Sequence, residues 1–250
     1  MIRILGAAAI CLAAAPALAL DICVEGAYPP FSETAPDGSI VGFDIDIANA
    51  LCAEIGESCT MVKVDWDGII PALIEKKCDA IIASMSATEE RRQVIDFTVK
   101  YYRSPARFVA KADSGLVPTA EGLAGKRVGV QRGTTHQTYM ERHFPQVEIV
   151  TYGSQDEAYL DLTSGRIDAL IGEALPIDSG FLKTPAGAGY AFFGDELYDP
   201  AIHGSGAAIG VRKDDAALRD RLSAAIEAIH ASGVYDTIQK KYFDIDIYGS

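Results

Sequence analysis

Positive charge is scarce in this sequence. Its 250 residues include 22 lysines and arginines against 35 aspartates and glutamates, so the formal net charge is −13 at pH 7. A protein of this sign repels phosphate backbones and anionic lipid, which excludes nucleic acid and anionic membranes as main partners. A cationic small ligand would be weakly attracted, but an acidic surface is also a common means of keeping a protein soluble.

Catalytic and metal-binding motifs are missing as well. The chain has no HExxH zinc motif, no nucleophile elbow and no P-loop. It has no CxxC pair and no cluster of cysteine and histidine with the spacing of zinc ligands. His143, His203 and His230 show no ligand spacing either, and we expect them on the surface. We therefore expect no metal ion and no cofactor.

A long apolar run occurs only at the start of the chain. Residues 1–19 carry a single charge, Arg3, and end in Ala-Leu-Ala, which fits the cleavage site of a signal peptide. The apolar part is too short to span a membrane, and Cys11 lacks the approach of a lipoprotein signal. We predict cleavage after Ala19 and export, which leaves a net charge of −14. The alternative is a retained N-terminal anchor.

Four cysteines remain in residues 20–250, and an even number favours disulfides in an exported chain, with three possible pairings. Cys52 and Cys59 lie at the end of a predicted helix and in the next turn, and closing this loop contributes about 2–3 kcal/mol. Cys23 and Cys78 each begin a predicted strand. They would lie side by side if these strands are neighbours in a parallel sheet; the alternative is two buried free thiols.

Apolar segments rich in β-formers alternate with helical patterns, and the alternation restarts after the extended segment at residues 101–110. Such alternation predicts α/β units with parallel sheets covered by helices. We expect strands at 22–26, 61–66, 79–86, 126–131, 148–153 and 168–172, and helices at 43–56, 69–77, 134–144, 158–165 and 214–233.

The sequence contains an internal repeat, LIEKKCDAIIAS at 73–84 and LTSGRIDALIGE at 162–173. Each copy reads as a helix, a tight turn and a strand, with Ser84 or Glu173 five residues after the shared aspartate. Ligands of open α/β sheets bind at the carboxyl ends of strands. Two similar lobes, each offering such an end, predict a cleft between them.

The turn ASMSATEERR at 83–92 has more hydrogen-bond donors than a strand-to-helix turn requires. Ser86 and Glu89 have the spacing of a capping box, which explains part of this excess. Neither Ser84 nor Arg91 is explained by capping. Hydroxyl groups and a guanidinium at a helix N-terminus suit a carboxylate.

Several segments, in unbroken order and spacing, resemble the periplasmic polar-amino-acid-binding proteins of ABC importers (solute-binding protein family 3). They are EGAYPPF, GFDIDIANALC, DWDGIIPALIEKKCDAIIASMSATEERR, VGVQRGTT and LRDRLSAAIEAIHASGVYDTIQKKYFDIDIYG. The closest likeness is to the lysine/arginine/ornithine and histidine receptors, and it covers nearly all of the chain after residue 19.

The resemblance implies an α/β fold of the periplasmic-binding-protein-like type II, with two lobes joined by two crossover hinge strands. Lobe 1 would comprise residues 20–104 and 206–250, and lobe 2 residues 105–205. The hinge would lie near Tyr102–Ala106 on the first crossing and near Asp199–Ser205 on the return.

The resemblance also implies where an amino acid would bind. Arg91, Ser86 and Thr135 match positions that hold the α-carboxylate. Ser84 matches a serine near the α-amino group. Glu173 lies opposite it, where the closest relatives carry aspartate, so this contact reaches further or leaves room for a larger group.

Selectivity for the ligand's side chain is implied at the end of the first strand. Glu25 falls where the basic-amino-acid receptors place an aspartate that meets the terminal cation, and Tyr28 and Trp66 fall on their aromatic walls. A cation held between such faces gains about 1–2 kcal/mol when desolvated. The alternatives are a solvated strand-end acid and two ordinary core aromatics.

The VGVQRGTTH turn departs from the close relatives. Gln131 replaces a leucine and His136 a glutamine, with Thr134 between them and Gly133 permitting close backbone approach. These polar changes could shift the preference toward larger or more polar cations, opines included. The alternative for His136 is an exposed position on a helix.

We therefore predict a periplasmic receptor that binds a basic amino acid. Arginine is the first candidate, followed by lysine, ornithine, histidine or an opine. The receptor, a monomer, would deliver the ligand to a membrane permease.

The competing prediction is a dehydratase of the same fold, similar to cyclohexadienyl dehydratase, with Glu173 as its acid. A detached sensory domain is disfavoured because the chain ends at YFDIDIYGS without a membrane segment.

Overall fold

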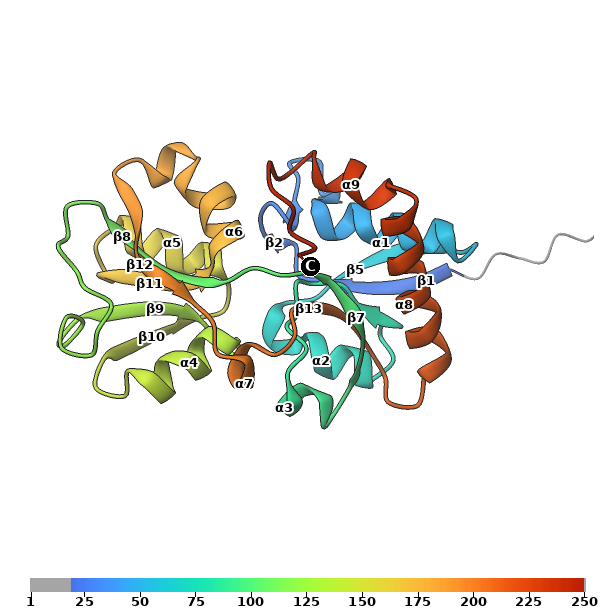
Figure 1. The fold of residues 1–250 in the computed structure, drawn as a ribbon, viewed down its shortest axis with the longest axis horizontal. Coiled ribbons are helices and arrows are strands. Elements are labelled where there is room, and N and C mark those ends of the chain that lie inside the picture. Colours follow the sequence, from blue (N-terminus) through green and yellow to red (C-terminus); the bar gives the residue numbers. More distant parts are fainter. Residues whose placement is uncertain (1–18, 250) are drawn as a thin grey trace, which may run out of the picture.

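The computed structural model describes residues 19–249, which form two α/β lobes (Figure 1). The predicted signal peptide lies outside these residues except for Ala19, where the first strand begins. No helix of residues 19–249 is long and apolar enough to cross a membrane.

The first lobe is built on a five-stranded sheet in the order β5-β1-β6-β13-β7. β1 pairs in parallel with β5 and β6, whereas β13 is antiparallel to β6 and β7. The strands are β1 (Ala19–Val24), β5 (Ser58–Lys63), β6 (Ala80–Ile81), β7 (Asp96–Tyr102) and β13 (Ala207–Val211). The helices are α1 (Phe43–Glu54), α2 (Trp66–Ile74), α3 (Glu89–Arg92), α8 (Ala216–Ala231) and α9 (Val234–Gln239). A small antiparallel sheet joins β2 (Ala27–Tyr28), β3 (Ser32–Thr34) and β4 (Ile40–Val41).

The second lobe repeats this plan with a sheet in the order β10-β9-β11-β8-β12. β9 lies in parallel between β10 and β11, and β8 is antiparallel to both β11 and β12. The strands are β8 (Ala106–Lys111), β9 (Arg127–Gln131), β10 (Glu148–Tyr152), β11 (Ala169–Glu173) and β12 (Tyr190–Leu197). The helices are α4 (Thr135–His143), α5 (Gln155–Thr163), α6 (Ala174–Ile177), the π-helix η1 (Asp178–Leu182) and the 3₁₀ turn η2 (Pro185–Gly187).

Two segments cross between the lobes (Figure 1). β7 continues through residues 103–105 into β8, and β12 returns through residues 198–206, which include α7 (Pro200–His203), into β13. The predicted fold class, two α/β lobes joined by two crossover strands, is confirmed. The proposed lobe limits at 104/105 and 205/206 fall within these two segments.

The predicted alternation of strands and helices is confirmed, but the residue bounds of some elements differ. The strand expected at 79–86 forms ladder bonds only over Ala80–Ile81. Ser84 adopts φ +53°, a left-handed conformation that is incompatible with a continuing strand. The helix expected at 69–77 begins earlier, at Trp66, with Asp65 in an extended conformation before it.

The internal repeat is a structural repeat. The backbone N–H of Asp79 donates to the Asp21 carbonyl at 2.7 Å, and its carboxylate accepts from the Asp21 N–H at 3.1 Å. Asp168 makes the same pair of bonds to Arg127, at 2.8 and 2.9 Å. Each lobe therefore uses the shared aspartate to fix the start of the strand that leads to the cleft.

Both predicted disulfides are present. Cys52 and Cys59 are bridged with their Cα atoms 5.9 Å apart, and Cys23 and Cys78 with theirs 5.7 Å apart. β1 and β6 are parallel neighbours as expected, although Cys23 lies near the end of β1 rather than at its start. Free thiols are therefore excluded at all four positions.

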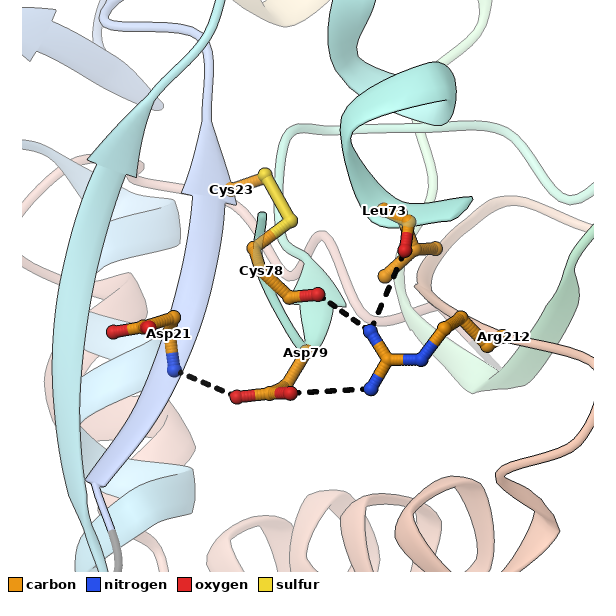
Figure 2. The surroundings of a disulfide bond; sticks show 6 residues. All are labelled: Asp21, Cys23, Leu73, Cys78, Asp79 and Arg212. Carbon is orange, nitrogen blue, oxygen red and sulfur yellow. Dashed lines mark hydrogen bonds and ion pairs between the residues drawn. A yellow bond between two sulfur atoms is a disulfide. The ribbon is translucent and has the colours of Figure 1, made fainter. Parts of the chain in front are cut away.

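Arg212 secures the same corner of the first lobe (Figure 2). Its guanidinium donates to the carbonyl oxygens of Leu73 and Cys78 and to the carboxylate of Asp79, the last at 3.1 Å. These bonds and the disulfide tie the end of α2 and the start of β6 to the sheet. The segment that leads toward Ser84 is therefore held at its origin.

We predict that the longer disulfide loop contributes more to stability. Replacing Cys23 and Cys78 by alanine should lower the free energy of unfolding by about 4 kcal/mol, because the bridge closes a sequence separation of 55 residues. In the matched control, alanine replaces both Cys52 and Cys59, whose bridge closes a sequence separation of only 7 residues. This change should lower the free energy of unfolding by about 2–3 kcal/mol. Urea unfolding of both variants measures the difference, and an equal or reversed order would contradict this account.

Candidate functional site

A cavity between the lobes brings all of the sequence-predicted site residues together. Its empty volume, counted to its opening, is about 310 Å³. The lining residues are Glu25, Tyr28, Trp66, Ala83, Ser84, Ser86, Arg91, Gln131, Thr134, Thr135, His136 and Glu173. Ala83 alone was not predicted from the sequence.

The first lobe supplies an acid and two aromatic rings. Glu25 follows directly after β1 and is only 4% exposed, so it is not a solvated strand-end acid. Tyr28 lies in β2, and Trp66 is the first residue of α2. Both rings are half-buried and line the cavity, which favours their interpretation as cavity walls over that of ordinary core residues.

The turn before α3 is arranged differently from the predicted capping box. Thr88 caps the helix, because its hydroxyl accepts from the backbone N–H of Arg91 at 3.2 Å. Ser86 instead pairs with Ala207 in an isolated β-bridge. The capping-box prediction is therefore wrong. Ser86 and Thr88 are both residue types that cap helices, but α3 begins at Glu89, so Thr88 is the residue in the cap position. The Ser86 side chain lines the cavity.

Arg91 spans the two lobes. Its guanidinium donates to the Ser86 carbonyl at 2.9 Å and to the Gly133 carbonyl of the second lobe at 3.0 Å, and lies 5.3 Å from the centre of the Trp66 ring. Gly133 has φ +67°, which glycine tolerates better than other residues. Burial lowers the pKa of Arg91 to about 10, so the group is still charged at neutral pH.

Asp44, which sequence analysis missed, holds Ser84 in place. Its carboxylate accepts from the Ser84 hydroxyl and from the Tyr101 hydroxyl, both at 2.9 Å, and the Tyr101 oxygen accepts from the Ser84 N–H at 2.9 Å. This closed set of bonds stabilises the left-handed backbone of Ser84. Asp44 is separated by four and seven residues from the buried Ala48 and Leu51, a helical spacing that indicates an inward position.

Glu173 closes the cavity from the second lobe. It is the last residue of β11, is 7% exposed, and accepts a hydrogen bond at 2.7 Å from the hydroxyl of Tyr102, the last residue of β7. Tyr102 was also missed from the sequence. The first crossing strand thus contacts an acid of the opposite lobe.

Gln131 and Glu25 meet across the cleft. The Gln131 side-chain amide donates to the Glu25 carboxyl at 2.6 Å and to the Gly153 carbonyl at 3.3 Å. Arg132 forms a further pair across the lobes with Asp67. Together with the Arg91 bond, these contacts show that the two lobes are closed on each other in this structure.

Two histidines adjoin the cavity. His136 is 7% exposed on α4, and its ring lies 6.1 Å from that of His203 on α7. Burial lowers the pKa of His136 to about 3, with smaller effects from His203 and Arg91, so its ring is neutral. The expected surface position of His203 is wrong: the residue is 8% exposed because α7 packs against α4, whereas His143 and His230 are exposed.

Three buried carboxyl groups dominate the electrostatics of the site. Burial raises the pKa of Glu25 and of Asp44 to about 7 and that of Glu173 to about 8. Hydrogen bonds from Gln131, from Ser84 with Tyr101, and from Tyr102 partly offset these increases. Among residues 19–249 no group of three or more histidine, cysteine or acidic residues is placed to hold a metal ion.

We predict an unusual pH dependence of stability for the ligand-free protein. Since Glu25, Asp44 and Glu173 bind protons more tightly folded than unfolded, their contribution is complete below the ordinary carboxyl pKa and is lost as pH rises through about 7–8. Urea unfolding should give a lower free energy at pH 8.5 than at pH 5. Glu25→Gln should reduce this loss, whereas the control Asp37→Asn, an exposed acid with a lowered pKa, should leave it unchanged. Stability that rises over this interval would contradict the assignment.

Known proteins resemble this chain over all or nearly all of its length. It is 47% identical over 255 residues to the L-arginine-binding protein of Pseudomonas aeruginosa, covering 100% of this chain and 98% of the relative. It is 44% identical over 232 residues to the histidine-binding periplasmic protein of Escherichia coli, covering 92% and 89%. A solved structure of a Salmonella typhimurium periplasmic binding protein, described for its high arginine specificity, matches with a TM-score of 0.84 at 36% identity, covering 91% and 100%.

The family assignment rests on residues 20–245, which match the model of the bacterial extracellular solute-binding proteins, family 3. This range includes both lobes, both crossings and every residue that lines the cavity. The resemblance inferred from the sequence motifs is thereby confirmed. The chain belongs to the bacterial extracellular solute-binding proteins, family 3.

Proposed function

We propose that this protein is the periplasmic receptor of an ABC importer and binds a basic amino acid, arginine first, between its lobes. The observation that carries the proposal is the charge pattern of the cavity, which is lined by one guanidinium, Arg91, and two carboxyl groups, Glu25 and Glu173. A basic amino acid presents the complementary set of one carboxylate and two cations. A neutral amino acid would leave one buried acid without a partner, at a cost in binding free energy.

The α-carboxylate would bind at Arg91, Ser86 and Thr135. Arg91 is already oriented by its bonds to two backbone carbonyls. Thr135 is the first residue of α4, whose cap Thr134 bonds to Gln137 and leaves early helix N–H groups available for an anion. Guanidinium and helix N–H groups together form a strong carboxylate site.

The α-ammonium would lie between Ser84 and Glu173. The Ser84 hydroxyl donates to Asp44, so its lone pairs are free to accept from an ammonium. Glu173 would ionise as it meets this cation, because a nearby positive charge favours the carboxylate and offsets burial.

The cationic side chain would lie against Tyr28 and Trp66 with its end at Glu25. Gln131, which contacts Glu25 in this structure, adds a carbonyl oxygen that can accept from a guanidinium. Names of the relatives support the same class, since one binds L-arginine and another histidine. Lysine and ornithine carry the same two cations and are the further candidates.

Transport would proceed by closure of the lobes around the ligand, with the two crossing segments as hinges, followed by delivery to a membrane permease. The relatives of this chain include periplasmic proteins, which supports a periplasmic location and a role for residues 1–19 as signal peptide. We propose that the receptor acts as a monomer.

A dehydratase of the same fold is the second candidate, and one observation favours it. Glu173 is buried and its pKa is raised to about 8, so the group could donate a proton as a general acid near neutral pH. The identified relatives are binding proteins, which favours the receptor.

The test is isothermal titration of the ligand-stripped protein with arginine, lysine, ornithine, histidine, glutamine and prephenate. We expect arginine to bind tightest. Glu25→Ala should weaken arginine by at least about a hundredfold, because a buried charge pair is lost, yet change glutamine by less than about tenfold. Asp37→Asn, which removes an exposed acid that does not line the cavity, is the matched control and should bind as the wild type does.

Each outcome discriminates between the candidates. Tight binding of glutamine with no effect of Glu25→Ala would refute the side-chain assignment. Turnover of prephenate by the purified protein would establish the dehydratase. Binding of arginine without turnover of prephenate would establish the receptor.

A further inference from the structure

Gly180 of the second lobe lies against Pro29 of the first. Gly180 is part of η1, the π-helix that follows α6, and Pro29 directly follows β2; α6 and β2 lie on the facing sides of the two lobes (Figure 1). A methyl group built on the Gly180 Cα would lie 2.5 Å from the Pro29 carbonyl oxygen and 3.2 Å from the carbonyl carbon. Because a real Cβ needs roughly 1 Å more room, the lobes reach this separation only with a residue that has no side chain.

The first-lobe side of this contact is held firmly. The backbone N–H of Phe31 donates to the Tyr28 carbonyl at 2.9 Å, which closes a turn around Pro29, and the Asp44 N–H donates to the Phe31 carbonyl at 2.9 Å. The Phe31 ring is buried and stacks on the Tyr102 ring, with 4.7 Å between their centres. The Pro29 carbonyl therefore cannot move aside without disturbing the core of the first lobe.

The second-lobe side is held in the same way. The backbone N–H of Lys183 donates to the Asp178 carbonyl at 2.9 Å across η1, and the neighbouring Phe181 is buried with its ring 4.6 Å from that of Tyr159. Gly180 itself faces away from this core, since the three atoms nearest to an added methyl group all belong to Pro29 of the other lobe. A larger residue at this position would therefore press on the opposite lobe.

This contact sets the width of the cavity between the lobes. Tyr28 directly precedes Pro29, Glu173 directly precedes the α6–η1 segment that contains Gly180, and both Tyr28 and Glu173 line the cavity. Moving the contact apart by roughly 1 Å would separate these two walls by a similar distance. The hydrogen bonds that join the lobes around the cavity are 2.6 and 3.0 Å long and would then exceed hydrogen-bond length.

We propose that Gly180 is a positioning residue for ligand binding: its missing side chain lets the Pro29 carbonyl seat against η1, and this contact fixes how far the lobes close. The ligand still reaches the first lobe, which supplies most of the lining residues. Thr135 and Glu173 of the second lobe contact the ligand only at full closure. This inference rests on the proposed basic-amino-acid receptor.

The test is Gly180→Ala, which adds one methyl group at the contact. Stopped-flow binding of arginine can be followed by the emission of Trp66, the single tryptophan of the chain, which lines the cavity. The dissociation constant should rise by at least about tenfold, the effect of losing a hydrogen bond to a charged group. The increase should come from faster dissociation, with the association rate within about threefold of the wild type, because the first lobe still captures the ligand.

X-ray scattering supplies a measurement that a loss of stability alone would not change. With saturating arginine, Gly180→Ala should have a larger radius of gyration than the wild type, because its lobes stop before full closure. Gly180→Val, which places a larger group at the same point, should increase both effects. The matched control Gly68→Ala adds the same methyl group in α2, where it meets Val64 Cγ1 at an ordinary 3.7 Å, and should leave the dissociation constant within about twofold.

The outcomes separate this inference from the proposed function. If Gly180→Ala binds arginine as the wild type does, or binds it more weakly but reaches the same radius of gyration, the positioning role is overturned and the receptor stands. If the wild type does not bind arginine, both are overturned. Urea unfolding without ligand should give the same midpoint for Gly180→Ala and the wild type; a variant that unfolds contradicts the inference, since the methyl group would then disturb its own lobe.

Discussion

Burial of carboxyl groups in the cleft is the constraint on which the rest of this structure depends. Glu25, Asp44 and Glu173 are each less than a tenth exposed, and the only guanidinium that lines the cavity is Arg91. Desolvation of an unpaired carboxylate is costly, so burial in the closed structure raises the pKa of all three groups. A ligand that brings two cations and one carboxylate removes this cost and therefore stabilises the closed arrangement of the lobes.

The scaffold keeps these acids from relaxing toward solvent. Ser84 is fixed by Asp44 and Tyr101, and its approach strand is anchored at the other end by the disulfide of Cys78 and by Arg212. The first crossing strand, β7, ends in Tyr101 and Tyr102. Tyr101 donates a hydrogen bond to Asp44 of the first lobe, and Tyr102 donates one to Glu173 of the second. Binding residues are therefore positioned by covalent and hydrogen-bonded supports that do not themselves line the cavity.

Much of this arrangement could be predicted from the sequence, because it depends on local patterns. The repeat and the strand ends predicted the cleft, and the turn at 83–92 predicted a carboxylate site near Ser84 and Arg91. The resemblance to the solute-binding family supplied most of the other residues, so that eleven of the twelve lining residues were named from the sequence. Asp44 was missed because an acid in the first turn of a helix is common for reasons of dipole alone, and only its spacing to Ala48 and Leu51 indicates burial. The burial of His203 depends on how the second crossing packs, which no local pattern encodes.

Two details of the turn before α3, its helix cap and the end of β6, differ from the prediction because they depend on tertiary contacts. Ser86 and Thr88 both suit a helix cap, and tertiary pairing of Ser86 with Ala207 decides between them. The early end of β6 follows from the left-handed backbone of Ser84, a conformation that only the Asp44 network makes favourable.

Proton release on ligand binding tests the central claim most directly. Titration of arginine into the protein at pH 7, in two buffers of different ionisation enthalpy, counts the protons exchanged. If cations of the ligand ionise Glu25 and Glu173, whose pKa values are about 7 and about 8, roughly one proton or more should be released for each arginine bound. Binding without proton release, or with proton uptake, would contradict the account.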